Sequence, residues 1–338
     1  MKKLLLATAA TAMVAGPVAA QGIDFSGYAR FGFQYVEDAT GGFGNDEVTT
    51  NSRFRLNMNA SAETDFGATL YVFQRAQTQT NDSFRNADGD QGNRATSFAA
   101  PRFGVRGGGL DVRLGNIVGA IEDMPGHYFG SRSAGLGLAG LGFHNMAGNM
   151  SGEAFQWDFF SSTGAGPAAN NGVEVVYSAA GFRAQISYTD GTDRETANGG
   201  TYRERVAATA AYTFGEYTAA IGIQETSDSS IQAKIDQQLV IATFGADFDQ
   251  FRVNAQLADR RGVKKGVLQG SYDVTPEATL LGFIAHESGN RPDFREFNGT
   301  SGGIGLAYAL GGGASIETGV VRTSNSNVVA DFGVFFSF

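Results

Sequence analysis

The strongest candidates for a functional role are four arginines near the start of the chain: Arg30, Arg53, Arg55 and Arg75. Each occupies a polar position in a segment where polar and apolar residues alternate, so its side chain shares a face with the other polar residues of that segment. Guanidinium groups gathered on one face repel one another, and they persist only in water or opposite carboxylates. The pattern therefore predicts a hydrated, positively charged wall.

Other reactive side chains form no catalytic or metal-binding constellation. The chain has no cysteine, and its histidines (His127, His144 and His286) are scattered, with no serine or carboxylate placed to complete a triad. Without cysteine, a Zn²⁺ site would need a cluster of histidines and carboxylates, which the sequence does not show. We therefore expect neither an enzyme nor a resident cofactor.

Two short motifs are weak indicators. Asp88 and Asp90 lie in an acidic, glycine-containing stretch that offers oxygen ligands for Ca²⁺. The full EF-hand spacing is missing, so a solvated loop is the favoured interpretation, with Ca²⁺ as a candidate ligand. Residues 135–140 match G-x-G-x-x-G, but they follow no βαβ pattern in a chain with 48 glycines, so the match indicates coincidence.

Alternation with a period of two recurs along most of the chain, which indicates β-strands. In segment 25–35, Phe31 and Phe33 fall on one parity, whereas Arg30 and Gln34 fall on the other. Further segments of this kind lie at 182–188, 203–213, 217–224, 250–258, 302–310 and 328–338. A soluble sandwich would also alternate, but the apolar parity here carries few charges in any segment, as a lipid-facing band requires.

Short turns and long connections alternate between these segments. The turns lie around 64–67, 107–109, 179–181, 214–216, 248–250, 274–277 and 310–313, and the longer stretches at 37–47, 80–95, 117–150, 190–201, 226–236, 259–264, 287–298 and 324–327. Tight periplasmic turns and long extracellular loops are typical of transmembrane barrels. Seven turns and eight loops join sixteen strands, so the expected fold is all-β, a sixteen-stranded antiparallel transmembrane β-barrel.

The two ends of the chain agree with export to an outer membrane. Residues 1–20 combine Lys2 and Lys3, an apolar stretch and a small-residue cleavage site, which together predict a secretory signal peptide. The remaining residues, 21–338, would form one barrel domain with 23 basic and 34 acidic residues, a net charge of −11 that argues against nucleic acid as a partner. Phe336 and Phe338 end an amphipathic last segment, which resembles the signal read by the barrel-assembly machinery.

Several of these segments resemble the trimeric general porins of the Rhodobacter type, within the Gram-negative porin superfamily. The resemblance covers most of the chain after residue 20 and rests on residues 26–32, 52–55, 61–67, 208–215, 310–316 and 329–334. It implies a homotrimer in which each barrel is a separate pore. It also implies that the third loop, residues 117–150 here, folds into the barrel as a constriction, and that Arg30, Arg53 and Arg55 match the family's basic wall.

The resemblance suggests how the pore would be lined. Glu122 and Asp123, at the start of the third loop, are the natural acidic partners of the basic wall, and a transverse field between the two would orient dipolar solutes. The loop holds only these two carboxylates, whereas the family's loop is rich in them. We therefore expect weak cation selectivity or none.

The expected function is passive diffusion of small hydrophilic solutes and ions across the outer membrane of a Gram-negative bacterium. Outer-membrane lipids and lipopolysaccharide would surround the barrel. The alternative is a substrate-specific porin of the same architecture, because Tyr71 and Phe73 share the parity of Arg75. A barrel enzyme or a structural anchor is not supported by the residues.

Overall fold

The computed structural model describes residues 22–37, 47–81, 94–128, 155, 157–160, 171–190, 203–228, 238–260, 262–289, 299–324 and 326–338. The expectations for the signal peptide, Asp88, Asp90, His144 and the glycine-rich run at 135–140 concern residues outside these ranges. In the part of the chain that is described, no helix is long and apolar enough to cross a membrane.

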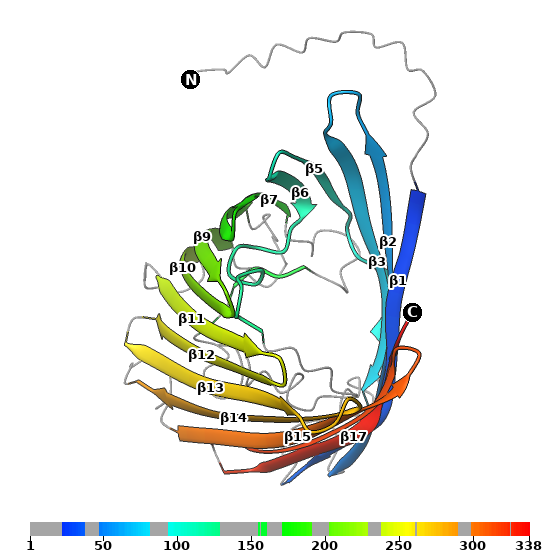
Figure 1. The fold of residues 1–338 in the computed structure, drawn as a ribbon, viewed down its shortest axis with the longest axis vertical. Helices are drawn as coiled ribbons and strands as arrows, with labels where there is room; N and C mark the ends of the chain where they lie inside the picture. The colour runs from blue at the N-terminus through cyan, green and yellow to red at the C-terminus, as the bar shows by residue number, and fades with distance from the viewer. Residues whose placement is uncertain are drawn as a thin grey trace, which may run out of the picture.

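The described chain is a succession of antiparallel β-strands. Their bounds are β1 Gly22–Val36, β2 Val48–Glu63, β3 Thr69–Asn81, β4 Arg94–Phe98, β5 Arg102–Gly107, β6 Leu110–Asn116, β7 Asn171–Ala179, β8 Phe182–Asp190, β9 Arg203–Phe214, β10 Tyr217–Asp228, β11 Leu239–Phe248, β12 Phe251–Arg260, β13 Val263–Asp273, β14 Ala278–Ser288, β15 Gly299–Gly311, β16 Ala314–Arg322 and β17 Val328–Ser337. Figure 1 shows these strands arranged as a ring.

The ring is closed by β1, which pairs with both β2 and β17. Tyr28 is the register partner of Arg55 on one side and of Ser337 on the other. At the same seam the backbone of Phe338 exchanges hydrogen bonds with Gly27, at 2.9 and 3.1 Å, and its ring stacks on Phe54 at 5.9 Å between centroids. Closure removes the unpaired sheet edge that lipid could not satisfy.

The seventeen strand segments occupy sixteen strand positions around the barrel, because β4 and β5 both pair with β3 and together form one interrupted strand. The C-terminal half of β3 pairs with β4, for example Ala76 with Phe98. The N-terminal half of β3 pairs with β5, for example Phe73 with Arg102. Pro101 lies in the interruption and has no N–H to donate to a ladder. The structure therefore confirms the expected sixteen-stranded antiparallel barrel.

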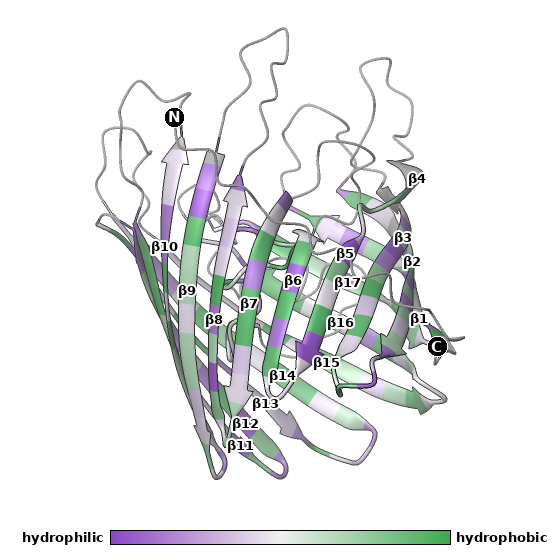
Figure 2. Ribbon diagram, turned by 90° about the horizontal axis from the view of Figure 1, so that it is seen from above, coloured by the Kyte–Doolittle hydropathy of each residue, from purple (hydrophilic) through white to green (hydrophobic). Residues whose placement is uncertain are grey.

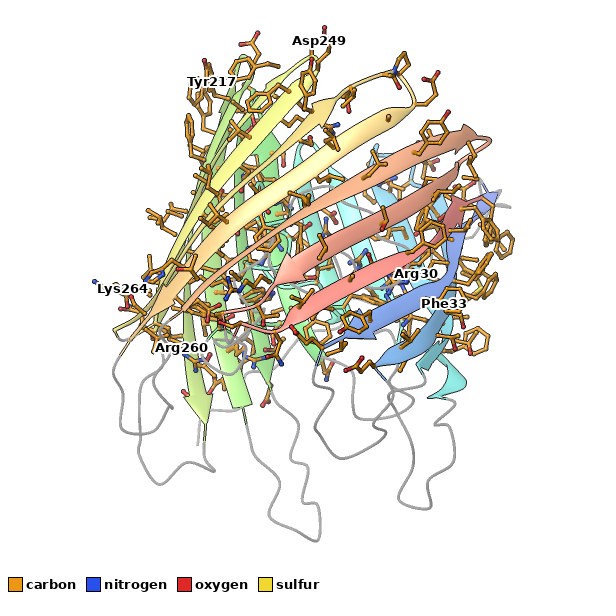
Figure 3. All side chains as sticks on the ribbon, turned by 90° about the horizontal axis from the view of Figure 1, so that it is seen from below. Arg30, Phe33, Tyr217, Asp249, Arg260 and Lys264 are labelled. Atoms are coloured by element: carbon orange, nitrogen blue, oxygen red, sulfur yellow. The ribbon has the colours of Figure 1, made fainter. Side chains whose placement is uncertain are left out.

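All seven expected tight turns lie at hairpins between consecutive strands. Two-residue hairpins need positive φ, which Gly108 and Gly109 adopt between β5 and β6 at 58° and 84°. Figure 3 places Tyr217 and Asp249 at this end of the barrel, and Arg260 and Lys264 at the opposite end. The expected separation of short turns from the other connections is thus seen in the fold. One predicted long connection is wrong: at 259–264, β12 continues to Arg260 and β13 begins at Val263, so only residues 261 and 262 join the two strands.

Strand alternation divides the barrel into two faces, which Figure 2 shows as alternating hydrophobic and hydrophilic bands. Phe31 and Phe33 on β1 are each 56% exposed on the outer face, whereas Gln34 on the inner face is buried. The outer aromatic band includes a series of ring contacts along the turn end of β9–β11. Tyr212, Phe214, Tyr217 and Phe244 are stacked in succession, and Phe248 meets Tyr217 edge-on. An apolar outside around a polar inside is the arrangement a membrane-spanning barrel requires.

The third connection is longer than expected. We predicted that it ends at residue 150, but β6 pairs directly with β7, which begins at Asn171, so the connection runs from 117 to 170. Within it the structure describes residues 117–128, called here the first limb, and residues 155 and 157–160, called the second limb. Figure 1 shows the segment that follows β6 passing inside the ring.

Candidate functional site in the barrel lumen

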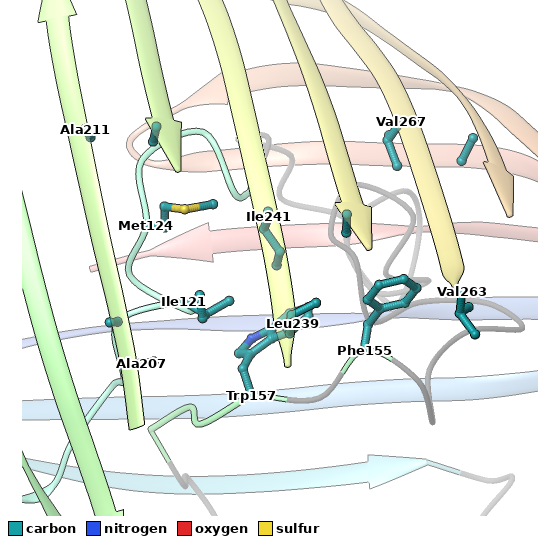
Figure 4. Packing of buried hydrophobic residues seen from close by; sticks show 14 residues of the cluster. Ile121, Met124, Phe155, Trp157, Ala207, Ala211, Leu239, Ile241, Val263 and Val267 are labelled. Atoms are coloured by element: carbon teal, nitrogen blue, oxygen red, sulfur yellow. The ribbon is translucent and has the colours of Figure 1, made fainter. Parts of the chain in front are cut away.

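The first limb packs against an apolar sector of the inner wall. Ile121 and Met124 join a buried cluster with Leu239 and Ile241 of β11, and all four side chains are at most 3% exposed. Figure 4 shows Ile121 and Met124 of the limb beside Leu239 and Ile241 of β11, on the lumen side of the strand. Burying an aliphatic side chain contributes roughly 1.5–3 kcal/mol, so this contact helps to hold the limb on the wall.

The sector is recognisable in the sequence as a lapse in alternation. Positions that face the lumen carry Leu239 and Ile241 on β11 and Val263 and Val267 on β13, where polar residues would normally face water. Further small apolar residues of the cluster lie on β9, β10, β12 and β14: Ala207, Ala211, Ala220, Ala258 and Ala285. These strands therefore offer a dry surface, which the third connection covers.

A buried carboxylate fixes the start of the first limb. Glu174 of β7 is fully buried; its Oε2 accepts the backbone N–H of Gly119 at 2.9 Å, and its Oε1 lies 3.0 Å from Nη1 of Arg113. The next residue, Ala120, donates its N–H to Ser187 Oγ at 2.9 Å. Glu174 was not predicted as a site residue, because nothing local in the sequence marks it; its role depends on where the third connection passes.

Side chains of β11 and β12 hold the end of the first limb. Thr243 Oγ1 donates to the carbonyl of Pro125 at 2.8 Å, and Gln256 Nε2 donates to the carbonyls of Gly126 and His127, each at 2.8 Å. Gly126 has a φ of 74°, and a Cβ at this position would lie 2.9 Å from Thr243 Oγ1. Glycine is therefore required where the limb lies closest to the wall.

The predicted acidic residues lie on the first limb, inside the barrel, but their contacts are with the two limbs and with the wall beneath them. Asp123 forms ion pairs with Arg183 at 2.5 Å and Arg113 at 3.4 Å. Glu122 Oε2 accepts hydrogen bonds from Tyr128 Oη at 2.5 Å and Trp157 Nε1 at 2.7 Å. Burial raises the pKa of the Glu122 carboxyl, while the hydrogen bonds from Tyr128 and Trp157 act in the opposite direction.

The second limb returns through the lumen. Phe155 is fully buried in the same apolar cluster as Ile121. Asp158 forms an ion pair with Arg205 of β9 at 2.6 Å and accepts a hydrogen bond from Thr189 of β8 at 2.6 Å. Phe160 lies against β3, where its ring meets Phe73 edge-on with centroids 5.0 Å apart.

The four predicted arginines face the lumen from neighbouring strands. Arg30 and Arg53 are register partners on β1 and β2. Arg53 donates to Tyr28 Oη at 3.3 Å, and the Arg55 guanidinium lies 5.0 Å from the centre of the Tyr28 ring. Arg55 donates to Gln77 at 2.7 Å, and Arg75 donates to Asn57 at 2.9 Å.

Two further arginines extend this basic wall and were missed. Arg102 of β5 is the register partner of Phe73, and Arg113 of β6 is the partner of Gly104. Their strands were the least clearly patterned in the sequence, because β4 and β5 are short and interrupted. Of the histidines, which formed no predicted site, His127 is buried beside Trp157, with ring centroids 4.6 Å apart, and His286 Nδ1 lies 2.9 Å from Thr300 Oγ1.

The arrangement is suited to the passage of solutes through the barrel. Within the described residues, no group of three or more histidine, aspartate or glutamate side chains could hold a metal ion. A barrel of sixteen strands is too wide for its own side chains to fill, so a water-filled channel remains. Charged side chains line this channel. The third connection narrows this channel from one side.

Comparison with known proteins agrees with this geometry. A family model described as Gram-negative porin matches residues 7–328. A porin of Rhodobacter capsulatus is 27% identical over 345 aligned residues, which cover 94% of this chain and 100% of that protein. A porin of Fuscovulum blasticum is 30% identical over 173 residues, covering 50% and 52% of the two chains.

Solved structures share the fold. Two engineered variants of the Rhodopseudomonas blastica porin superpose on 94% of this chain and 100% of theirs with a TM-score of 0.71, at 23% and 24% identity. The family model spans nearly the whole chain, and the closed barrel with its infolded connection agrees with it. The chain therefore belongs to the Gram-negative porin family and is a general porin of the outer membrane.

Proposed function

We propose that the pore discriminates weakly between ions, being weakly cation-selective or unselective, and admits small hydrophilic solutes by passive diffusion. The observation that carries this proposal is the engagement of the loop carboxylates. Asp123 is paired with Arg183 and Arg113, and Glu122 is held by Tyr128 and Trp157. A carboxylate already paired with a guanidinium attracts a passing cation less than a solvated one does.

Opposing charges support weak selectivity. The basic wall of Arg30, Arg53, Arg55 and Arg75 disfavours cations in the lumen, whereas the net charge of −11 after residue 20 favours them near the mouths. We assign these four arginines as the basic side of the constriction, and Glu122 and Asp123 as its acidic side. The transverse field between them is then weaker than in a pore whose loop carboxylates are solvated.

A planar lipid bilayer tests the proposal. Across a gradient of KCl, the zero-current potential of the purified protein should lie close to zero or show a small preference for K⁺. A clear preference for Cl⁻ would overturn the assignment of weak cation selectivity. Absence of ion conductance, with the barrel folded, would instead contradict an open pore.

The alternative, a substrate-specific porin, has one observation in its favour. Phe73 faces the lumen between Arg75 and Arg102, whose guanidinium carbons lie 5.4 and 5.0 Å from the ring centre. Tyr71, which shares this parity, is engaged with Asp111 at 2.7 Å. Liposome swelling decides between the two: rates that fall smoothly with solute size indicate general diffusion, and saturable uptake of one solute indicates the alternative.

We also propose a homotrimer with independent pores, assembled in a membrane of phospholipid and lipopolysaccharide. The terminal strands carry large apolar side chains on their outer face, including Phe31, Phe33 and Phe332, which can pack against a second barrel. Three equal conductance steps per insertion event are expected. Single steps only, from protein that migrates as a monomer after chemical cross-linking, would exclude the trimer.

Export and assembly complete the proposal. Residues 1–20 would be removed as a signal peptide, leaving 21–338 as one barrel domain with no resident cofactor and no enzymatic activity. Phe336 and Phe338 would form the terminal signal for the barrel-assembly machinery. Phe336 is on the outer face, 39% exposed, and Phe338 is 54% exposed, so both side chains are available to a partner during assembly. N-terminal sequencing of protein purified from the outer membrane checks the cleavage site.

A further inference from the structure

Phe160 connects two distant sectors of the lumen wall. Asp158, two residues earlier, is fixed to Thr189 of β8 and Arg205 of β9, whereas Phe160 reaches Phe73 of β3. In the sheet, β5, β6 and β7 lie between β3 and β8. The second limb therefore crosses this part of the lumen from β8 and β9 to β3, and Phe160 makes the contact with β3.

At that contact the phenyl rings alternate with guanidinium groups. Arg75 lies 4.6 Å from the centre of the Phe160 ring and 5.4 Å from that of Phe73. Arg102 lies 5.7 and 5.0 Å from the same two centres. Both arginines are thus within the range of a cation–π contact with both rings, and Phe160 itself is only 8% exposed.

The rings hold Arg102 without neutralising it. Other lumen arginines near the third connection form ion pairs: Arg113 with Glu174, Arg183 with Asp123 and Arg205 with Asp158. Arg102 forms no ion pair in the described part of the chain; its contacts there are the two rings. A guanidinium stacked on a ring keeps its charge and its planar N–H edge, which matches a carboxylate bidentately.

We propose that Phe160 is a specificity-determining residue, which holds Arg75 and Arg102 as a recognition point for carboxylate-bearing solutes. The inference rests on the proposed pore and deepens it by naming a class of solute that interacts with the wall. A small anionic metabolite of this class would pause at the two guanidinium groups. Chloride offers only one point of contact and would pass with little retention.

Succinate is a suitable probe because it carries two carboxylates. Added to KCl at constant ionic strength, it should reduce the single-channel conductance of the wild type in a saturable manner. Phe160→Leu keeps apolar bulk but removes the aromatic face, so the saturable effect of succinate should be lost. Phe160→Ala should lose the effect of succinate and conduct more in KCl, because the lumen is wider.

Phe159→Ala is the matched control, since Phe159 is adjacent in the chain but is 55% exposed, whereas Phe160 is 8% exposed. It should behave like the wild type. Heat-modifiable migration on gels confirms that each variant is folded. The proposal is overturned if succinate has no saturable effect on the wild type, or if Phe160→Leu responds to succinate as the wild type does. Absence of wild-type conductance in KCl would count against the pore itself.

Discussion

Glu174 and Arg113 face each other as register partners on β7 and β6, with Glu174 Oε1 3.0 Å from Arg113 Nη1 and the carboxylate fully buried. Because the other oxygen of Glu174 accepts the Gly119 N–H, one carboxylate joins the barrel wall to the first limb. Removing one partner of a buried ion pair typically costs about 3–5 kcal/mol when the remaining charge is left uncompensated. The cost should be smaller here, because Arg113 also pairs with Asp111 at 2.8 Å and with Asp123 at 3.4 Å.

Glu174→Gln should therefore loosen the first limb while the barrel stays closed. The amide can still accept from Gly119, but it cannot balance Arg113. We expect larger open-channel current noise and a changed mean conductance in planar bilayers, with unaltered heat-modifiable migration. Glu216→Gln, in the exposed turn between β9 and β10, is the control and should leave both quantities unchanged. Identical noise in wild type and Glu174→Gln would contradict the anchoring role.

The basic wall gives a prediction about ion preference. Arg53→Gln removes one positive charge from a cluster in which Arg30 and Arg53 are direct partners across two strands. The zero-current potential in a KCl gradient should shift toward K⁺, and the shift should shrink at high salt, where charges are screened beyond about 3 Å at 1 M. Arg252→Gln serves as control, because Arg252 is also a lumen residue but lies 3.6 Å from Asp273 on another part of the wall. Equal shifts in the two variants would show that position within the lumen does not matter.

The barrel itself could be predicted from the sequence because its determinants are local. Alternation places Phe31 outside and Arg30 inside whatever the rest of the chain does, and glycines such as Gly109 mark the hairpin turns. The course of the third connection could not be predicted in this way. Residues 117–170 have no period, and their positions follow from contacts with strands that are distant in sequence.

The same distinction explains which site residues were found. Arg30, Arg53 and Arg55 lie on regular strands, so their parity alone places them in the lumen. Glu174 and Asp158 matter because of what they anchor, and a single buried carboxylate on a strand looks like any lumen residue. One indicator was available in the sequence: apolar residues at lumen-facing positions, such as Leu239 and Ile241, indicate a sector that another segment covers.

That apolar sector leads to a stability prediction. Ile121→Ala removes a side chain of the first limb that is 1% exposed, and such substitutions usually cost about 2–5 kcal/mol. The loss should fall on docking of the limb and not on the barrel, whose strands are held by their own ladders. Hydrogen exchange of the amides at 119–127 should become faster, with exchange in β9–β13 unchanged. Val105→Ala, on the outer face of β5, is the control for the loss of an apolar side chain.

The seam gives a prediction about closure. Phe338→Ala removes the ring that stacks on Phe54 but keeps the backbone hydrogen bonds with Gly27. An aromatic pair contributes about 0.5–1.5 kcal/mol beyond its buried area, so the folded barrel should lose only a few degrees of thermal stability. Yield in the outer membrane should fall by much more if Phe338 is also an assembly signal. A parallel loss of yield and of stability would argue that its role is structural alone.

The fluorescence of Trp157 can report the protonation of Glu122, because Trp157 is the one tryptophan of the chain and its indole N–H donates to Glu122 Oε2 at 2.7 Å. Burial raises the pKa of Glu122, so the folded protein binds a proton at this carboxyl more readily than the unfolded chain does. Stability of the docked limb should therefore increase as pH falls through the raised pKa, and decrease as pH rises through it. Trp157 fluorescence should titrate over the same range.

Glu122→Gln should abolish that titration while leaving the indole hydrogen bond, since the amide oxygen can still accept. Two neighbours must be separated from this effect: Asp123, which follows in the chain and is paired with Arg183, and His127, whose ring centre lies 4.6 Å from that of Trp157. Asp123→Asn should keep the transition, and a component that survives in Glu122→Gln and disappears in His127→Gln belongs to the imidazole. If the fluorescence of Glu122→Gln follows pH as the wild type does, the buried carboxyl is not the group that titrates, and Glu122 does not set the pH dependence of limb docking.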